Sequence, residues 1–273
     1  MKDWNDEFAN AAYIHNGNHY PEQWAKAAQQ FREQPPLHWQ LVPYGELERE
    51  SIYVFHPNTS SVSGLAIFVH GGYWMAFDAS YWSHLAKGAL AQGWVVAMPS
   101  YTLAPHARIS AITQQIGKAI NYLAERYTGA IHLAGHSAGG HLVTRMMCED
   151  SPLTPAVQAR LKRVLSISGL HDLRPLLQTT MNQTLQLDRW EARSESVALL
   201  FPLPEVELRC WVGANERPEF IRQTDLLVNL WGSLNVKVKG VYAPHEHHFS
   251  VINDLARADS ALVQAWVGME AGE

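Results

Sequence analysis

The residues around Ser137 have the types and the spacing that a hydroxyl nucleophile requires. Gly135, Ser137 and Gly139 fit the pattern G-x-S-x-G, which stands between an apolar run at 131–133 and a helical pattern. A nucleophile on a sharp strand-to-helix turn has a strained backbone, and small flanking residues make that strain tolerable. Such a turn exposes the Ser137 hydroxyl, so the pattern predicts a nucleophile that attacks an acyl carbonyl. The alternative is a glycine-rich helix start in which Ser137 is only a cap.

A second glycine-rich segment follows the apolar run at 64–70. His70, Gly71 and Gly72 are similar to the HGG-type oxyanion loop of esterases, where glycines let backbone N–H groups point at a developing negative charge. We expect the backbone amides of Gly71, Gly72 and Ala138 to form this oxyanion hole. His70 itself is expected to hold the loop by hydrogen bonds and to transfer no proton.

The nucleophile needs a base, and with this motif the chain order is serine, then acid, then histidine. A histidine cluster follows the strand that we expect at 236–242. We predict that His248 is the base, because Phe249 and the helix expected next would hold its backbone. His247 is the alternative.

Two acidic residues compete for the position between serine and histidine. Glu216 follows the strand expected at 206–212, and Asp172 follows the strand expected at 163–168. Either carboxylate could orient the imidazole and stabilise its cation without taking the proton. We favour Glu216, because its loop lies at the carboxyl end of the strand next to that of the histidine, where such folds assemble their sites.

The histidine cluster also suggests a metal site, since His245, His247 and His248 surround Glu246. Consecutive residues on one loop cannot all turn toward one ion, and the helical pattern H-E-x-x-H is missing from the sequence. We therefore expect no metal, and the chemistry above calls for no organic cofactor.

Short apolar runs bounded by turn residues indicate strands from about residue 37 onward. The runs at 64–70 and 94–98 are apolar without alternation, as expected for strands buried on both faces of a parallel sheet. Strands alternate with helical patterns, which implies βαβ units and an α/β fold. The predicted strands are 38–43, 51–56, 64–70, 93–99, 130–134, 163–168, 206–212 and 236–242.

The helical patterns have apolar residues at helical spacing, for example Ile112, Ile116 and Ile120. The polar, leucine-rich segment at about 172–203 has no strand signal, so we expect a helical insertion over one end of the sheet. The first 36 residues are expected to pack outside the sheet and to carry no chemistry. The predicted helices are 79–92, 111–127, 138–148, 218–231 and 250–267.

Length and charge restrict the class of protein. A chain of 273 residues is long enough for one large core, so we expect a single domain over 1–273. The net charge of −5, without a basic cluster, predicts a small-molecule substrate and no nucleic-acid partner. Neither a signal peptide nor a membrane span is indicated. With Cys148 and Cys210 expected to be reduced core residues, the predicted compartment is the cytoplasm.

The chain resembles the kynurenine formamidases (arylformamidases), a family of α/β-hydrolases, from about Tyr44 onward. This implies a mostly parallel sheet flanked by helices, with 172–203 as a cap-like insertion. Carried over residue by residue, the family triad falls on Ser137, Glu216 and His248. The departure is Glu216, where the animal enzymes have aspartate. The matching stretches are 44–45, 70–74, 101–105, 168–173, 175–176, 212–220 and 248–249.

The resemblance implies hydrolysis of the formamide of N-formyl-L-kynurenine to formate and kynurenine. The substrate is an aromatic amide, so Tyr73 and Trp74 beside the oxyanion loop are candidates for stacking on its ring. The alternative is that these two residues are core or lid aromatics. Four further residues are candidate substrate contacts, although surface or packing roles explain each of them as well: Tyr20, Arg145, Asn182 and Arg189.

Two other functions remain open from the sequence. The first is a carboxylesterase for short acyl esters, because the same groups cleave esters more easily than amides. The second is a binding protein that kept the hydrolase fold and lost catalysis. The complete set of Ser137, Glu216 and His248 argues against the second.

Overall fold

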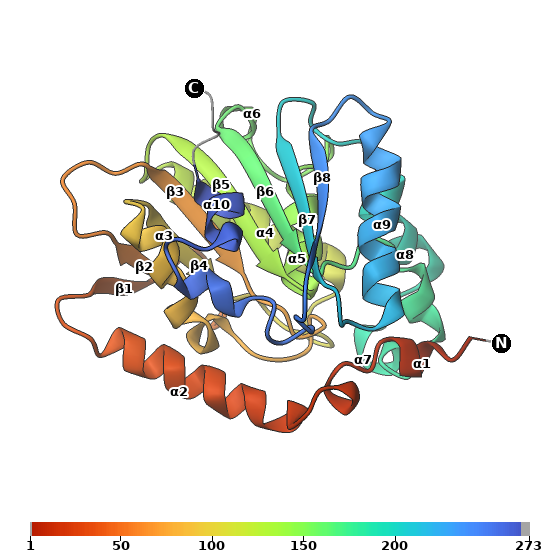
Figure 1. The fold of residues 1–273 in the computed structure, drawn as a ribbon. Coiled ribbons are helices and arrows are strands. Elements are labelled where there is room, and N and C mark those ends of the chain that lie inside the picture. Colours follow the sequence, from red (N-terminus) through yellow and green to blue (C-terminus); the bar gives the residue numbers. More distant parts are fainter. Residues whose placement is uncertain (1, 269–273) are drawn as a thin grey trace.

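The computed structural model describes residues 2–268. Within this part of the chain, eight strands form one sheet in the order β1-β2-β4-β3-β5-β6-β7-β8 (Figure 1). The pairs β1–β2 and β2–β4 are antiparallel, and the other pairs are parallel. The predicted, mostly parallel α/β sheet is therefore confirmed. The strands are β1 His38–Pro43, β2 Ser51–His56, β3 Gly64–Val69, β4 Val95–Pro99, β5 Ala130–His136, β6 Leu161–Ile167, β7 Glu207–Gly213 and β8 Val238–Ala243.

Helices cover both faces of this sheet, and every residue of β3 and β4 is buried. Successive residues of β3 alternate between two hydrophobic clusters, with Leu65 and Ile67 in one and Ala66 and Phe68 in the other. This explains the apolar run without alternation in the sequence. On the Leu65 face lie α4 (Ile109–Ala124), α5 (Ala138–Arg145) and α9 (Pro218–Gly232), and on the Ala66 face lie α2 (Tyr20–Arg32), α3 (Lys87–Ala91) and α10 (Ala261–Val267) (Figure 1).

The helices predicted at 111–127, 138–148 and 218–231 are present as α4, α5 and α9, with ends shifted by a few residues. The first 36 residues, expected to form helices and loops outside the sheet, contain α1 (Trp4–Glu7) and α2, whereas the four-residue helix α6 (Pro155–Gln158) was not predicted. None of the helices in the described part of the chain is long and apolar enough to cross a membrane.

The helix predicted at 79–92 is wrong as a continuous element. The structure has two 3₁₀ turns, Ala79–Tyr81 and Ser83–Ala86, before α3 begins. The side chain of Asp78 accepts a hydrogen bond from the Ser80 backbone N–H at 2.8 Å. This bond caps the first 3₁₀ turn, and α-helical geometry begins only at Lys87.

The helix predicted at 250–267 is also broken. A 3₁₀ turn at Asn253–Ala256 comes first, and only Ala261–Val267 is α-helical. The Ser260 hydroxyl accepts a hydrogen bond from the Val263 N–H at 3.0 Å, so Ser260 is the N-cap where α10 starts anew.

The segment between β6 and β7 is the one in which we expect a helical insertion. It contains α7 (Asn182–Leu185), α8 (Arg189–Ser194) and 3₁₀ turns on either side. The carboxylate of Glu191 accepts hydrogen bonds from Arg108 Nη2 at 2.6 Å and from the Ser110 hydroxyl at 2.7 Å. These bonds tie α8 to the start of α4 and fix the insertion against the sheet domain.

Candidate active site

Ser137 occupies the turn between β5 and α5. Its backbone has φ 56° and ψ −118°, outside the conformations that L residues favour, and its N–H donates to the Ile167 carbonyl at 2.8 Å. A Cβ at Gly139 would lie 2.0 Å from the Val69 carbonyl oxygen, and a Cβ at Gly135 would lie 2.1 Å from the Gly139 carbonyl oxygen. The turn can therefore form only because these two residues have no side chain.

The loop after β3 lies directly against this turn. A Cβ at Gly71 would lie 2.8 Å from the His136 carbonyl oxygen and 3.0 Å from the Ser137 Cβ. Gly72 has φ +107° and lines the same cavity as Ser137, and Ala138 is the fully buried first residue of α5. The three residues predicted for the oxyanion hole thus surround the serine.

His70 holds the conformation of that loop. Its Nδ1 donates to the Gly71 carbonyl at 2.8 Å, and its ring stacks on Tyr101 with a centroid distance of 4.4 Å. Burial lowers the pKa of His70 to about 4, so the ring is neutral at pH 7. This geometry agrees with a structural role for His70.

The carboxylate of Glu216 is bound on both oxygens. Oε2 lies 2.6 Å from Nδ1 of His248, while Oε1 accepts from the Ser168 hydroxyl at 2.5 Å and from the Gly213 N–H at 2.8 Å. The Glu216 side chain has no exposed surface. A carboxylate fixed in this way selects the tautomer of His248 with a proton on Nδ1, which leaves Nε2 free to accept a proton.

His248 is fixed on the other side by His136. The carbonyl of His248 accepts from Nε2 of His136 at 2.9 Å, and the two rings lie 4.6 Å apart. Burial holds the pKa of His136 well below its usual range, so His136 is a neutral donor. The ring of Phe220 packs against His248 with a centroid distance of 4.4 Å.

Ser137 and His248 both line one cavity of 290 Å³. Among residues 2–268 the Ser137 hydroxyl makes no hydrogen bond to another group, so it is available to a ligand in that cavity. Catalytic hydrogen bonds are often long in unliganded sites and tighten when substrate binds. The structure therefore brings together the predicted nucleophile, base and acid.

The two alternatives for the base and the acid have other partners. Nδ1 of His247 accepts from the N–H groups of Phe249 and Ser250, both at 3.2 Å, and its Nε2 lies 3.2 Å from the Tyr20 hydroxyl. Asp172 is paired with Arg174 through bonds of 2.8 and 2.9 Å. Neither His247 nor Asp172 lines the cavity that contains Ser137.

The walls of the cavity beside Ser137 are aromatic and apolar. The N-terminal segment, which was expected to carry no chemistry, covers one side of the cavity. That segment has no motif of its own, and only its aromatic residues could have signalled a role. The lining residues are Ala9, Asn10, Ala11, Ala12, Trp24, Gly72, Tyr73, Phe77, Trp82, His136, Ser137, His248 and Phe249.

Of the two aromatic residues after the oxyanion loop, only Tyr73 lines the cavity. Its hydroxyl donates to the Phe8 carbonyl at 2.7 Å and accepts from the Asn10 side chain at 3.3 Å. Trp74 has no exposed surface and packs edge-on against His141, with a centroid distance of 5.2 Å. The prediction that Trp74 stacks on a substrate is wrong for this structure, because the indole is part of the core.

The four other candidate substrate contacts lie away from this cavity. Tyr20 packs on His247, and Arg145 pairs with Glu195 and Asp150. The amide of Asn182 bonds the backbone of Leu187, and Arg189 is the exposed first residue of α8. These four side chains have the packing and surface roles that the sequence left as the alternative.

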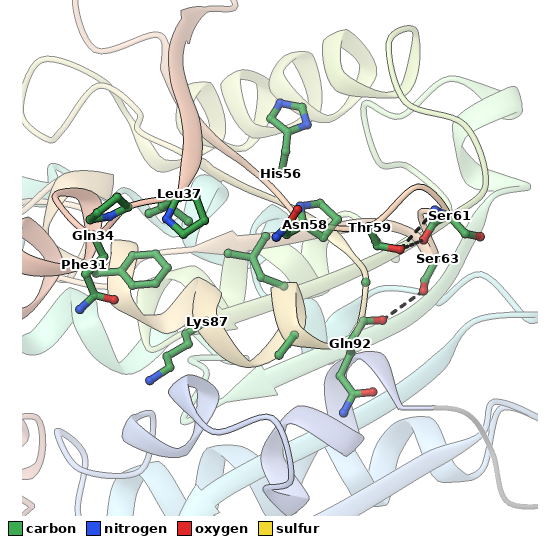
Figure 2. A pocket seen from close by; sticks show the side chains of 16 residues that line it. Phe31, Gln34, Leu37, His56, Asn58, Thr59, Ser61, Ser63, Lys87 and Gln92 are labelled. Carbon is green, nitrogen blue, oxygen red and sulfur yellow. Dashed lines mark hydrogen bonds between the residues drawn. The ribbon is translucent and has the colours of Figure 1, made fainter.

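A cavity of 620 Å³ lies elsewhere on the molecule, between the end of α2, the loop after β2, and α3 (Figure 2). Phe31, His56 and Lys87 line it, and the hydroxyl of Ser63 bonds the Gln92 carbonyl at its rim. Its lining includes no residue of the predicted triad or oxyanion hole.

Similar proteins were found at the level of families and of whole chains. The BD-FAE family model matches residues 51–198. Kynurenine formamidase from Salmo salar is 30% identical over 237 residues, with 84% of this chain and 80% of that protein covered. Kynurenine formamidase from Danio rerio is 28% identical over 236 residues, with coverage of 84% and 80%.

Solved structures have the same fold. A crystal structure named "putative thioesterase" from Silicibacter sp. TM1040 has 46% identity and a TM-score of 0.91, with 97% of this chain and 99% of that chain covered. Esterase B from Lactobacillus rhamnosis has 16% identity and a TM-score of 0.70, with coverage of 96% and 91%. The second likeness concerns the fold alone, which is the α/β-hydrolase fold expected from the sequence.

Proposed function

The chain belongs to the kynurenine formamidase family of α/β-hydrolases, and we propose that it hydrolyses an aryl formamide, N-formyl-L-kynurenine, to formate and L-kynurenine. The observation that carries this proposal is the contact of 2.6 Å between Glu216 and His248 beside a strained Ser137, in a cavity with aromatic walls. The relatives from Salmo salar and Danio rerio, both named kynurenine formamidase, support this choice of substrate.

In the first half of the reaction, Nε2 of His248 takes the proton of the Ser137 hydroxyl as the oxygen attacks the formyl carbon. The product is a tetrahedral intermediate with one negative oxygen. Collapse breaks the C–N bond, and His248 gives its proton to the departing aryl amine. Glu216 stabilises the imidazolium in the meantime and stays ionised.

In the second half, the same histidine removes a proton from water, which attacks the formyl group on Ser137. Collapse of the second tetrahedral intermediate releases formate, and His248 returns the proton to Ser137. Both halves use only groups of the chain and a water molecule.

The negative oxygen of each intermediate needs donors that are in place before the reaction. We propose the backbone N–H groups of Gly71, Gly72 and Ala138 for this role. One such donor contributes about 10²- to 10³-fold to kcat in other serine hydrolases. The hydrogen bond from His70 to the Gly71 carbonyl fixes the loop, so little reorganisation is required when charge develops.

The aromatic walls fit the leaving group. Trp24, Phe77, Trp82 and Phe249 form edge-on and tilted contacts with one another, and all four line the cavity. Aromatic rings pack well against such faces and edges. An aryl amine is also a better leaving group than an alkyl amine, because the ring delocalises the nitrogen lone pair.

A second candidate function is hydrolysis of short-chain acyl esters. It is favoured by the thioesterase name of the structure with 46% identity, since a thioesterase also cleaves an activated acyl group. The catalytic groups would be the same, since esters are cleaved more easily than amides.

The test is kcat/KM for N-formyl-L-kynurenine and for p-nitrophenyl acetate, with the Ser137→Ala variant as the control for contaminating activity. We expect the formamide to be hydrolysed at about 10⁴ M⁻¹ s⁻¹ or faster, as is usual for a natural substrate. Hydrolysis of the ester without the formamide would support the second candidate and overturn the first.

A further inference from the structure

A second, polar cavity adjoins the aromatic cavity at the triad. Its volume is 200 Å³, and it shares Asn10 and His248 with the aromatic cavity. A molecule that fills the aromatic cavity and reaches Ser137 therefore has a second compartment within reach on the far side of His248. The lining residues are Asn10, Tyr13, Ile14, Asn215, Glu216, Arg217, Pro218, His247 and His248.

Arg217 is the lining residue whose side chain is permanently positive. Its guanidinium lies 3.7 Å from the ring centroid of Tyr13, and its Nη2 donates to Asp6 at 2.5 Å. The side chain is only 18% exposed, so it is held in place from both sides. A fixed guanidinium loses little conformational entropy when it binds an anion.

The guanidinium keeps donors to spare. Asp6 occupies Nη2 alone, and within the described residues Nη1 has no hydrogen-bond partner. Nε is buried without a partner, whereas Nη1 is not among the buried unpaired atoms, so Nη1 keeps some exposed surface. Since Arg217 lines the polar cavity, its guanidinium has a free donor to offer to an anionic group bound there.

The acidic groups nearby leave part of this guanidinium available. Asp6 pairs with Nη2 and offsets part of the charge, but its side chain is 44% exposed and it bonds no other nitrogen of Arg217. The carboxylate of Glu216 is taken up by His248, Ser168 and Gly213. Glu219, two residues along, is bound by Arg222 and Lys2.

We propose that the polar cavity binds the amino-acid end of the substrate and that Arg217 binds its α-carboxylate through Nη1. This inference rests on the proposed function and deepens it. In N-formyl-L-kynurenine six bonds separate the formyl carbon from the α-carbon, which lets the two lie up to about 8 Å apart. With the formyl carbon at Ser137 and the ring between the aromatic walls, the amino-acid end would extend into the adjoining polar cavity, which shares Asn10 and His248 with the aromatic one.

The contact between Arg217 and the α-carboxylate would make the affinity for a substrate depend on a charged residue that takes no part in catalysis. Loss of a hydrogen bond to a charged group weakens binding by about 10- to 100-fold. Arg217→Met should therefore raise KM for N-formyl-L-kynurenine by that factor, with a smaller effect on kcat. Arg217→Lys keeps the charge and should recover part of the loss.

The experiment compares substrates with and without the amino-acid end. The matched substrate is 2′-formamidoacetophenone, which has the same ring, ketone and formamide but no amino-acid end, and p-nitrophenyl acetate is the third. For Arg217→Met we expect the rise in KM only with N-formyl-L-kynurenine. An equal loss with all three substrates would overturn the proposal, because Arg217 would then be a purely structural residue.

Asp6→Asn is the matched control for the structural explanation. It breaks the ion pair with Arg217 and keeps the guanidinium. If Arg217 binds the carboxylate, removal of a competing anion should lower KM for N-formyl-L-kynurenine or leave it as it is. If instead the ion pair only holds the N-terminal segment in place, Asp6→Asn and Arg217→Met should both lower the turnover of all three substrates. That result would overturn the proposal.

A binding measurement separates this proposal from the proposed function. L-kynurenine and 2′-aminoacetophenone are tested as competitive inhibitors of p-nitrophenyl acetate hydrolysis, which requires no formamidase activity. We expect Arg217→Met to raise Ki for L-kynurenine by about 10- to 100-fold and to leave Ki for 2′-aminoacetophenone within about threefold. Equal shifts for both inhibitors, or none, would overturn the role of Arg217 even if the formamide is a substrate.

Discussion

The Glu216→Gln variant tests the assignment of the acid through the hydrogen bonds of both carboxylate oxygens. Oε1 faces the N–H of Gly213 at 2.8 Å, and Oε2 faces Nδ1 of His248 at 2.6 Å. In glutamine the amide oxygen must take the place of Oε1, because an amino group there would face the N–H of Gly213. The amino group of the variant is then directed at Nδ1 of His248.

The consequence is the wrong tautomer of the base. Nδ1 of His248 must accept a hydrogen bond from the amide, so the ring proton moves to Nε2, which can no longer take the proton of Ser137. In a serine protease triad the equivalent change lowers kcat by about 10⁴-fold. This corresponds to a barrier higher by about 5 kcal/mol, and we expect a loss of that size here.

The assay is kcat for p-nitrophenyl acetate, with Ser137→Ala as the background and thermal unfolding as the check on folding. Asp172→Asn is the matched control, because Asp172 was the other candidate acid and its partner in the structure is Arg174. We expect less than a threefold change for Asp172→Asn. If folded Glu216→Gln retains a tenth of the wild-type kcat, or if Asp172→Asn loses more than Glu216→Gln, the assignment of Glu216 is refuted.

Three further predictions follow from burial and close contacts. Gly71→Ala places a Cβ 3.0 Å from the Ser137 Cβ, so kcat should fall by about 100-fold or more in steady-state kinetics; a normal kcat would exclude Gly71 from the oxyanion hole. Trp74→Ala should lower the free energy of unfolding by about 3–5 kcal/mol in a urea titration; a raised KM with unchanged stability would place Trp74 in the cavity wall instead. Burial lowers the pKa of His70 and of His171 to about 4. Histidines in the unfolded chain bind protons near pH 6.5, so the unfolded state gains protons first as the pH falls. Stability should be lost between pH 6.5 and 4, by about 3 kcal/mol for each histidine, and a urea midpoint that stays constant over this range would contradict the burial of neutral rings.

The nucleophile turn was predictable because its sequence signal is local. Gly135 and Gly139 lie within two residues of Ser137, although the contact that excludes a side chain at Gly139 comes from Val69 on the neighbouring β3. The strands were predictable for a similar reason, since burial on both faces leaves an apolar run in the sequence. The break at 79–92 was not predictable, because the sequence pattern does not distinguish two 3₁₀ turns followed by a short α-helix from one continuous helix.

The environment of Trp74 could not be predicted from spacing. Tyr73 and Trp74 both have positive φ, 50° and 58°, so neither the alternation of a strand nor the period of a helix applies to them. One side chain consequently enters the cavity while its neighbour enters the core. The choice between His247 and His248 also depends on tertiary contacts, since the Tyr20 hydroxyl that engages His247 belongs to α2.

The segment that decides the shape of the site lies outside the segment that carries the motifs. The BD-FAE family model covers 51–198, which includes Ser137 and the oxyanion loop but neither the N-terminal wall nor Arg217. Tyr73 nevertheless connects the N-terminal wall with the oxyanion loop. Its hydroxyl forms hydrogen bonds with Phe8 and Asn10, and it follows Gly72 directly in the sequence. A change in the N-terminal segment therefore acts on cavity shape and on the oxyanion loop through one side chain. For this reason a match to the nucleophile motif predicts acyl transfer, whereas the substrate depends on contacts that the motif does not contain.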